Sequence, residues 1–271
     1  MTMAKRILFF IYGVVCYLTF LGTFLYAIGF IGGFGVPTTL DGPATEPWPR
    51  ALAVNAGLLA LFAVQHSVMA RKWFKQQWTR IVPKPIERST YVLFSSLALI
   101  LLFWQWRPMG GEVWSVDGAP AALALRVLFA FGWGLVLVST FLIDHFDLFG
   151  LRQVWLYLVG TPYTARTFAT PGPYRLVRHP LYVGWFFAFW MTPTMTLAHL
   201  VFAIATSVYI LLAIQFEEHD MVREFGETYE DYRRRVPMLV PFTASGGSQP
   251  RGAAPRSRLQ SSSAAPQSTR P

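Results

Sequence analysis

A polar run near the end of the chain carries residue types that could bind a charged ligand. It reads G-P-Y-R-L-V-R-H-P-L-Y-V-G and covers residues 172–184. Pro180 suits the first turn of a helix, so Arg178 and His179 would lie at a helix N-terminus. Unpaired N–H groups and the helix dipole favour an anion there, and Tyr182 adds an aromatic face with a hydroxyl. The alternative is a helix cap with a snorkelling arginine.

A second polar block follows after about thirty apolar residues and covers residues 217–241. It begins with the adjacent carboxylates Glu217 and Glu218, which suit a cation such as an ammonium, a sulfonium or a metal. The alternative is a solvated first turn of a helix, where acidic side chains also favour the dipole. A helical hairpin in the apolar segment would bring both polar blocks to the same membrane face.

Two histidines lie upstream at the ends of apolar segments. His66 follows Gln65 in the second segment, with Asn55 further along it, and His66 could be a general base, a haem ligand or a hydrogen-bonded core histidine. Asp144 and His145 end the fourth segment, and a carboxylate beside an imidazole can orient it and raise its basicity. The alternative for this pair is a polar helix terminus.

The elements that position these groups are predicted to be membrane helices. The chain has 271 residues, of which 54% are hydrophobic and 14% charged, whereas soluble domains carry about 25% charged residues. A span needs ~20 apolar residues. Four segments qualify, and a fifth is broken near Pro193 into a hairpin: Ile7–Val36, Ala51–Ala70, Ser89–Trp106, Ala121–Ile143 and Leu181–Phe216.

The distribution of Lys and Arg predicts the orientation. The connections carry 2, 1, 6, 1, 4 and 8 of them in chain order, so rich connections alternate with poor ones. By the positive-inside rule both termini and both polar blocks are cytoplasmic. We expect an integral protein of a bacterial inner membrane. The lipid bilayer explains the net charge of +9 better than a nucleic acid does, and the oligomeric state stays open.

The C-terminal part is predicted to leave the bundle. Residues 217–235 alternate acidic and basic side chains and space four apolar or aromatic ones by three and four: Met221, Phe225, Tyr229 and Tyr232. This spacing predicts an amphipathic cytoplasmic helix. The tail, 243–271, is rich in Ser, Ala, Pro and Gly and is predicted to be disordered. We therefore expect one all-α polytopic membrane domain over 1–242.

The motifs in residues 172–241 carry a family resemblance. The order R-H-P-x-Y-x-G, hairpin, E-E, F-G-x-x-Y-x-x-Y and V-P-x-x-x-P resembles the isoprenylcysteine carboxyl methyltransferase and phospholipid methyltransferase superfamily. The resemblance implies that this half-site binds S-adenosyl-L-methionine without a metal. The implied cofactor contacts are Tyr174, Arg178, His179, Pro180, Tyr182, Glu217, Glu218, Tyr229, Tyr232 and Arg233.

The upstream motifs narrow the resemblance. Q-H-S-V-M-A-R, P-K-P-I-E-R-S-T-Y-V-L and D-H-F-D-L-F-G-L-R-Q-V look like the bacterial branch that contains methanethiol S-methyltransferases and NnrU-like proteins. This implies a small volatile thiol as substrate. A thiol needs a base, and the expected base is His66, oriented by Gln65 or Asp144, with His145 as second choice. Asn55 and Gln65 are expected to line the substrate pocket.

Two other readings remain open at the level of sequence. The acceptor could instead be a prenylcysteine carboxylate or a lipid amine, which needs a wide lateral opening. A haem-binding or sensing membrane protein could use His66, His145 or His179 as axial ligands. Soluble Rossmann-type methyltransferases are not indicated, because the chain has no G-x-G-x-x-G motif.

Overall fold

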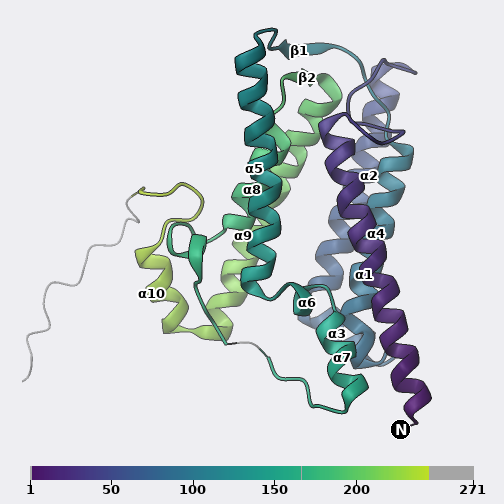
Figure 1. Ribbon diagram of the computed structural model, residues 1–271, viewed down its shortest axis with the longest axis vertical. Helices are drawn as coiled ribbons and strands as arrows, with labels where there is room; N and C mark the ends of the chain where they lie inside the picture. The colour runs from purple at the N-terminus through teal and green to yellow at the C-terminus, as the bar shows by residue number, and fades with distance from the viewer. Residues whose placement is uncertain (1, 166, 244–271) are drawn as a thin grey trace, which may run out of the picture.

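The computed structural model describes residues 2–165 and 167–243 as a helical bundle (Figure 1). Within them, five helices are long and apolar enough to cross a membrane, which confirms the predicted all-α polytopic fold. These helices are α1 (Met3–Gly32), α2 (Trp48–Ala70), α4 (Lys84–Gln105), α5 (Ala119–Ile143) and α9 (Leu197–Phe225). The predicted tail lies outside the described residues apart from Thr243.

Shorter elements complete the two ends of the bundle. They are α3 (Lys72–Trp78), β1 (Glu112–Ser115), α6 (His145–Leu148), α7 (Leu151–Val159), the 3-10 turn η1 (Gly172–Arg175), α8 (Pro180–Trp190), β2 (Thr194–Thr196) and α10 (Glu227–Arg235). Figure 1 shows β1 and β2 at one end, and α3, α7, α10 and the N-terminus at the other. These are called the β1–β2 end and the α10 end below.

The predicted hairpin is formed by α8 and α9. Its turn is not a simple loop, because β2 pairs antiparallel with β1, and Val116 N–H donates to the Pro193 carbonyl over 3.0 Å. Backbone that leaves a helix inside a membrane protein needs such internal partners. The two strands are too short to show an alternating pattern, so they were not predicted.

Close helix packing holds the hairpin against α5. A Cβ on Gly132 would lie 2.8 Å from the Gly184 carbonyl oxygen, and a Cβ on Gly184 would lie 2.8 Å from the Gly132 carbonyl oxygen. Small residues let membrane helices approach at backbone distance. The start of α8 is therefore fixed against α5.

Two of the differences from the predicted boundaries have a cause in the backbone. The first helix is Met3–Gly32 rather than Ile7–Val36, because Gly33 takes a left-handed conformation, with φ 73°, that ends the helix. The predicted single helix over 217–235 is divided at Gly226, whose φ of 54° and ψ of −131° break the helical path. Its first half continues α9, and only α10 leaves the helix axis.

Candidate active site

The two polar blocks meet at the α10 end through one buried carboxylate. Arg178 Nε donates to Glu218 Oε1 over 2.6 Å, and His179 Nε2 lies 3.1 Å from the same oxygen. The arginine also donates through Nη1 to the carbonyls of Arg233 and Val236, at 3.1 and 2.6 Å. One guanidinium thus joins the start of α8, the body of α9 and the end of α10.

Backbone hydrogen bonds reinforce this junction. The N–H groups of Arg178 and His179 donate to the carbonyls of Pro237 and Met238, at 2.9 and 3.2 Å. His179 is the N-cap residue of α8, and Pro180 occupies its first turn as predicted. Glu218 is therefore occupied by protein donors, and it ties α9 to the start of α8.

Glu217 is the more exposed carboxylate of the pair. Its side chain is 47% exposed, and its Oε2 accepts a hydrogen bond of 3.0 Å from the Tyr182 hydroxyl. His179 Nδ1 lies 3.9 Å from the same oxygen. The structure thus separates two adjacent carboxylates that the sequence treats as equivalent.

Three tyrosines border this junction. Tyr232 donates its hydroxyl to the Tyr174 carbonyl over 2.6 Å, and Tyr229 packs edge-on against Tyr232. Burial raises the pKa of Tyr232 to about 12, although Arg178 nearby opposes the shift. Burial, with a carboxylate nearby, also raises the pKa values of Tyr174 and Tyr229. All three phenols therefore stay protonated and can act as hydrogen-bond donors at neutral pH.

Two buried hydroxyls beside the junction lack a hydrogen-bond partner in the part of the chain that the structure describes. By distance and angle, neither Tyr174 OH nor Ser139 Oγ has a hydrogen-bond partner among the described residues. Leaving a buried polar group unpaired costs about 1–3 kcal/mol, so the pair fits a polar ligand such as the hydroxyls or amino-acid group of S-adenosyl-L-methionine. Together with Glu217, the residues present fit that cofactor.

His66 lies in a hydroxyl-rich setting between α2 and α4. Its Nδ1 is 3.1 Å from Ser95 Oγ, and the Tyr91 hydroxyl is 3.0 Å from both ring nitrogens. Phe62 stacks on the imidazole with a centroid distance of 5.2 Å. Neither Gln65 nor Asp144 is among the hydrogen-bond partners of His66 in the described residues, so Tyr91 and Ser95 orient the ring.

A line of phenols connects His66 with the Glu217 side. Tyr91 of α4 is hydrogen-bonded to His66, and Tyr182 of α8 donates to Glu217 of α9. Tyr209 shares a hydrogen bond of 2.9 Å with the hydroxyl of Ser67, the residue after His66. The predicted base and the predicted cofactor half-site therefore border one region between α2, α4, α8 and α9.

The other expected substrate contacts have different surroundings. Gln65 Nε2 donates to the sulfur of Met69 over 3.1 Å, and its Oε1 is buried without a partner among the described residues. Asn55 lies towards the β1–β2 end, where it exchanges two hydrogen bonds, of 2.8 and 2.9 Å, with the backbone of Arg107. Asn55 thus fixes the chain after α4 and is remote from His66.

Asp144 and His145 form a separate structural unit. Both ring nitrogens of His145 are engaged, Nε2 with Tyr17 OH at 2.9 Å and Nδ1 with Thr140 Oγ1 at 2.8 Å. The ring stacks on Phe141 at 4.2 Å, and burial lowers its pKa. Asp144 caps α6 by accepting from the N–H of Asp147. This histidine ties α6 to α1 and is not placed next to His66.

The chain matches curated proteins along most of its length. A methanethiol S-methyltransferase of Crocosphaera subtropica is 61% identical over 232 residues, which cover 86% of this chain and 91% of that protein. A Mycobacterium tuberculosis protein of that name is 54% identical over 238 residues, 88% of this chain and 98% of the relative. The chain belongs to the methanethiol S-methyltransferase family. No protein-family model and no solved structure matches it.

In this methanethiol S-methyltransferase family member, the structure places four further residues at the candidate site that the sequence did not single out. They are Tyr91, Ser95, Ser139 and Tyr209. A signal for two of them exists, since Tyr91 and Ser95 are four residues apart in an apolar segment and must share a helix face. Ser139 and Tyr209 lie in the mainly apolar helices α5 and α9, and only the packing shows what they face.

Proposed function

We propose that the protein transfers a methyl group from S-adenosyl-L-methionine to methanethiol and so forms dimethyl sulfide. The observation that carries this proposal is the 61% identity with a methanethiol S-methyltransferase over most of both chains. The geometry supports it, because Glu217 is open to a cation while His66 borders the same region. S-adenosyl-L-methionine supplies a methyl group on a sulfonium sulfur, which becomes a neutral thioether on transfer.

The cofactor side is assigned to residues with free polar atoms. Glu217 faces the cationic part of the cofactor, and Tyr182 orients that carboxylate through its hydrogen bond. Tyr174 and Ser139 offer their unpaired hydroxyls. Arg178 contributes indirectly, because its ion pair holds α8 and α9 at the distance that this pocket needs.

The acceptor side is assigned to His66. A thiolate is the reactive nucleophile, and even a cysteine thiol, which is more acidic than a small alkyl thiol, has a pKa of ~8.5. The neutral imidazole takes the thiol proton while the new C–S bond forms and the methyl–sulfonium bond breaks. Tyr91 and Ser95 hold the ring by hydrogen bonds. Holding both reactants in line within a dry site supplies a further part of the rate.

The bilayer is the proposed route for the substrate. The positive-inside pattern puts the α10 end at the cytoplasmic face of a bacterial inner membrane, where the soluble cofactor is available. Methanethiol is small and weakly polar, so it can reach the region between α2 and α9 from the lipid without an aqueous channel.

The test is production of dimethyl sulfide by the purified full chain. Protein in detergent with S-adenosyl-L-methionine and methanethiol should release dimethyl sulfide into the headspace, measured by gas chromatography. His219→Ala is the matched control, because His219 is exposed on α9. If the protein binds the cofactor but releases no dimethyl sulfide, methanethiol is not the acceptor. Methyl transfer to a prenylcysteine carboxylate or a lipid amine, offered in place of methanethiol, would identify the alternative acceptor.

A further inference from the structure

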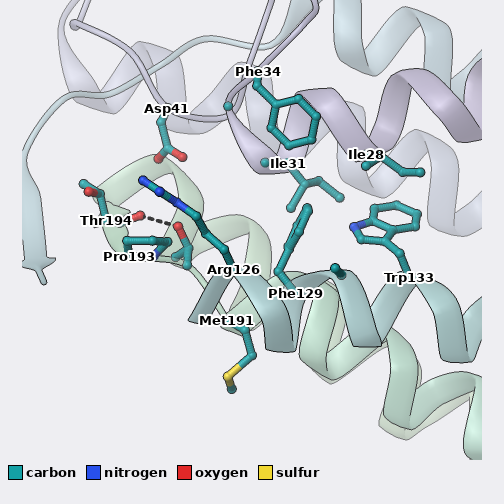
Figure 2. A pocket seen from close by; sticks show the side chains of 14 residues that line it. Ile28, Ile31, Phe34, Asp41, Arg126, Phe129, Trp133, Met191, Pro193 and Thr194 are labelled. Carbon is teal, nitrogen blue, oxygen red and sulfur yellow. Dashed lines mark hydrogen bonds between the residues drawn. The ribbon is translucent and has the colours of Figure 1, made fainter. Parts of the chain in front are cut away.

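A cavity of about 580 Å³ lies at the β1–β2 end, away from the candidate active site. It is bordered by the end of α1, by α5 and by the hairpin turn, as Figure 2 shows. Its walls are mostly apolar, and they include Ile28, Ile31, Phe34, Phe129 and Met191. Nothing in the proposed methyl transfer uses this cavity.

Arg126 gives the cavity a positive charge inside a membrane helix. It is the one Lys or Arg within the five apolar segments of the sequence, and it lines the cavity from the first half of α5. It forms no hydrogen bond or ion pair within the described residues. An ionisable residue inside a span is costly and marks a functional site by default.

No ion pair joins Arg126 to the nearby carboxylate of Asp41 among the described residues. Asp41 also lines the cavity, but its Oδ2 pairs with His199 Nδ1 at 3.0 Å and its Oδ1 accepts from Thr196 Oγ1 at 2.6 Å. Both oxygens of Asp41 are thus engaged with the start of α9. The guanidinium is left to attract an anion from outside the protein.

Trp133 provides a second unsatisfied donor in the same cavity. Its side chain lines the cavity and is only 5% exposed, yet the indole N–H has no partner among the described residues. Figure 2 shows the indole nitrogen on the side of the ring that faces the other lining residues. Trp133 lies seven residues after Arg126, so both share one face of α5 about 10 Å apart.

We propose that this cavity binds one phospholipid molecule from the membrane. Its phosphodiester pairs with Arg126, an ester carbonyl accepts the Trp133 N–H, and an acyl chain covers Phe129 and Ile28. A glycerophospholipid carries an anion, an acceptor and an apolar chain in this order along its length. A free phosphate would leave the indole N–H and the apolar walls unused.

Native mass spectrometry of the full chain released from detergent micelles tests the proposal, with phosphatidylglycerol as the probe. The wild type should retain one lipid per chain, and Arg126→Gln should weaken retention about tenfold. Trp133→Phe keeps an aromatic ring and removes the donor, and it should weaken retention about fivefold. Thermal unfolding identifies any variant that fails to fold. If Arg126→Gln does not fold, lipid retention by Trp133→Phe tests the proposal.

Arg50→Gln is the matched control, because Arg50 is an exposed arginine at the same end of the bundle. It should retain lipid as the wild type does. Equal retention by the wild type, Arg126→Gln and Trp133→Phe would overturn the proposal, since the lipid would then be bulk annular lipid. Displacement of the lipid by inorganic phosphate alone would also overturn it.

Discussion

Arg178 and Glu218 form a buried ion pair of 2.6 Å between residues forty positions apart in the sequence, with both side chains 10% exposed. The pair stands where α8 begins and where α9 leaves the apolar part of the bundle. Because the same guanidinium also binds the carbonyls of Arg233 and Val236, this contact ties α8, α9 and α10 together.

Removing the arginine should destabilise the protein strongly. Arg178→Ala leaves Glu218 buried without its main counter-charge, which typically costs about 3–5 kcal/mol. Arg233→Ala is the control, because Arg233 is half-exposed and 3.9 Å from Glu218, and such pairs contribute about 1 kcal/mol or less. Thermal unfolding in detergent compares them. Similar losses in both variants would contradict the assigned roles.

Glu217 should distinguish a sulfonium from a neutral thioether. Glu217→Gln should weaken S-adenosyl-L-methionine binding about tenfold, because the open carboxylate is replaced by a neutral amide of the same shape. S-adenosylhomocysteine lacks the sulfonium charge, so its affinity should change little. Isothermal titration calorimetry with both ligands measures the difference. Equal loss for both would mean that Glu217 contacts another part of the cofactor.

His66 should matter less as the pH rises. His66→Ala should reduce turnover about 10²–10⁴-fold at neutral pH, the usual contribution of a general base. The fraction of substrate that is already thiolate rises with pH, even below the pKa of an alkyl thiol, which lies above the ~8.5 of a cysteine thiol, so the deficit should shrink. Tyr91→Phe retains the base and should cost about tenfold or less. Dimethyl sulfide release across pH 6.5–9.5 is the measurement, and a pH-independent deficit would exclude proton removal by His66.

His145 should make the folded state acid-sensitive. Its pKa in the folded protein is lowered by burial, so the unfolded chain binds more protons below its ordinary pKa of ~6.5. Stability from this group is complete above that pH and is lost as the pH falls through it. His145→Gln should flatten the dependence of the unfolding temperature between pH 5 and 7. An unchanged slope would assign the acid sensitivity to other groups.

The α5–α8 contact should tolerate no larger side chain. A Cβ on Gly184 would lie 2.8 Å from the Gly132 carbonyl oxygen and 2.9 Å from the Val136 backbone nitrogen. Gly184→Val must therefore push the helices apart, and overpacking of this kind costs about 1–3 kcal/mol or more. Gly134→Val is the control, because a Cβ on Gly134 meets nothing within 4 Å. Unfolding temperature and cofactor binding should fall only in the first variant.

The sequence predicts the elements better than the contacts between them. Apolar length and the break at Pro193 are local signals, and they suffice for the five spans and the hairpin. The role of His145 depends on Tyr17, 128 residues away, and no spacing rule connects them. Gly226 lies inside a continuous amphipathic pattern, so the pattern conceals the boundary between α9 and α10. Glu217 is exposed and Glu218 is buried because Arg178 pairs with Glu218, and adjacent positions in the sequence do not show this difference.

The hydrogen bonds from Arg178 and His179 to the carbonyls of Pro237 and Met238 also bear on biosynthesis. The ribosome adds these acceptors after all five membrane-crossing helices. The proposed cofactor site at the start of α8 is therefore completed only after the last of those helices has been synthesised. A nascent chain with every membrane-crossing helix inserted would still lack the segment after α10 that fixes the start of α8. Products of premature termination before residue 238 should therefore sit in the membrane as inert proteins that do not consume cofactor.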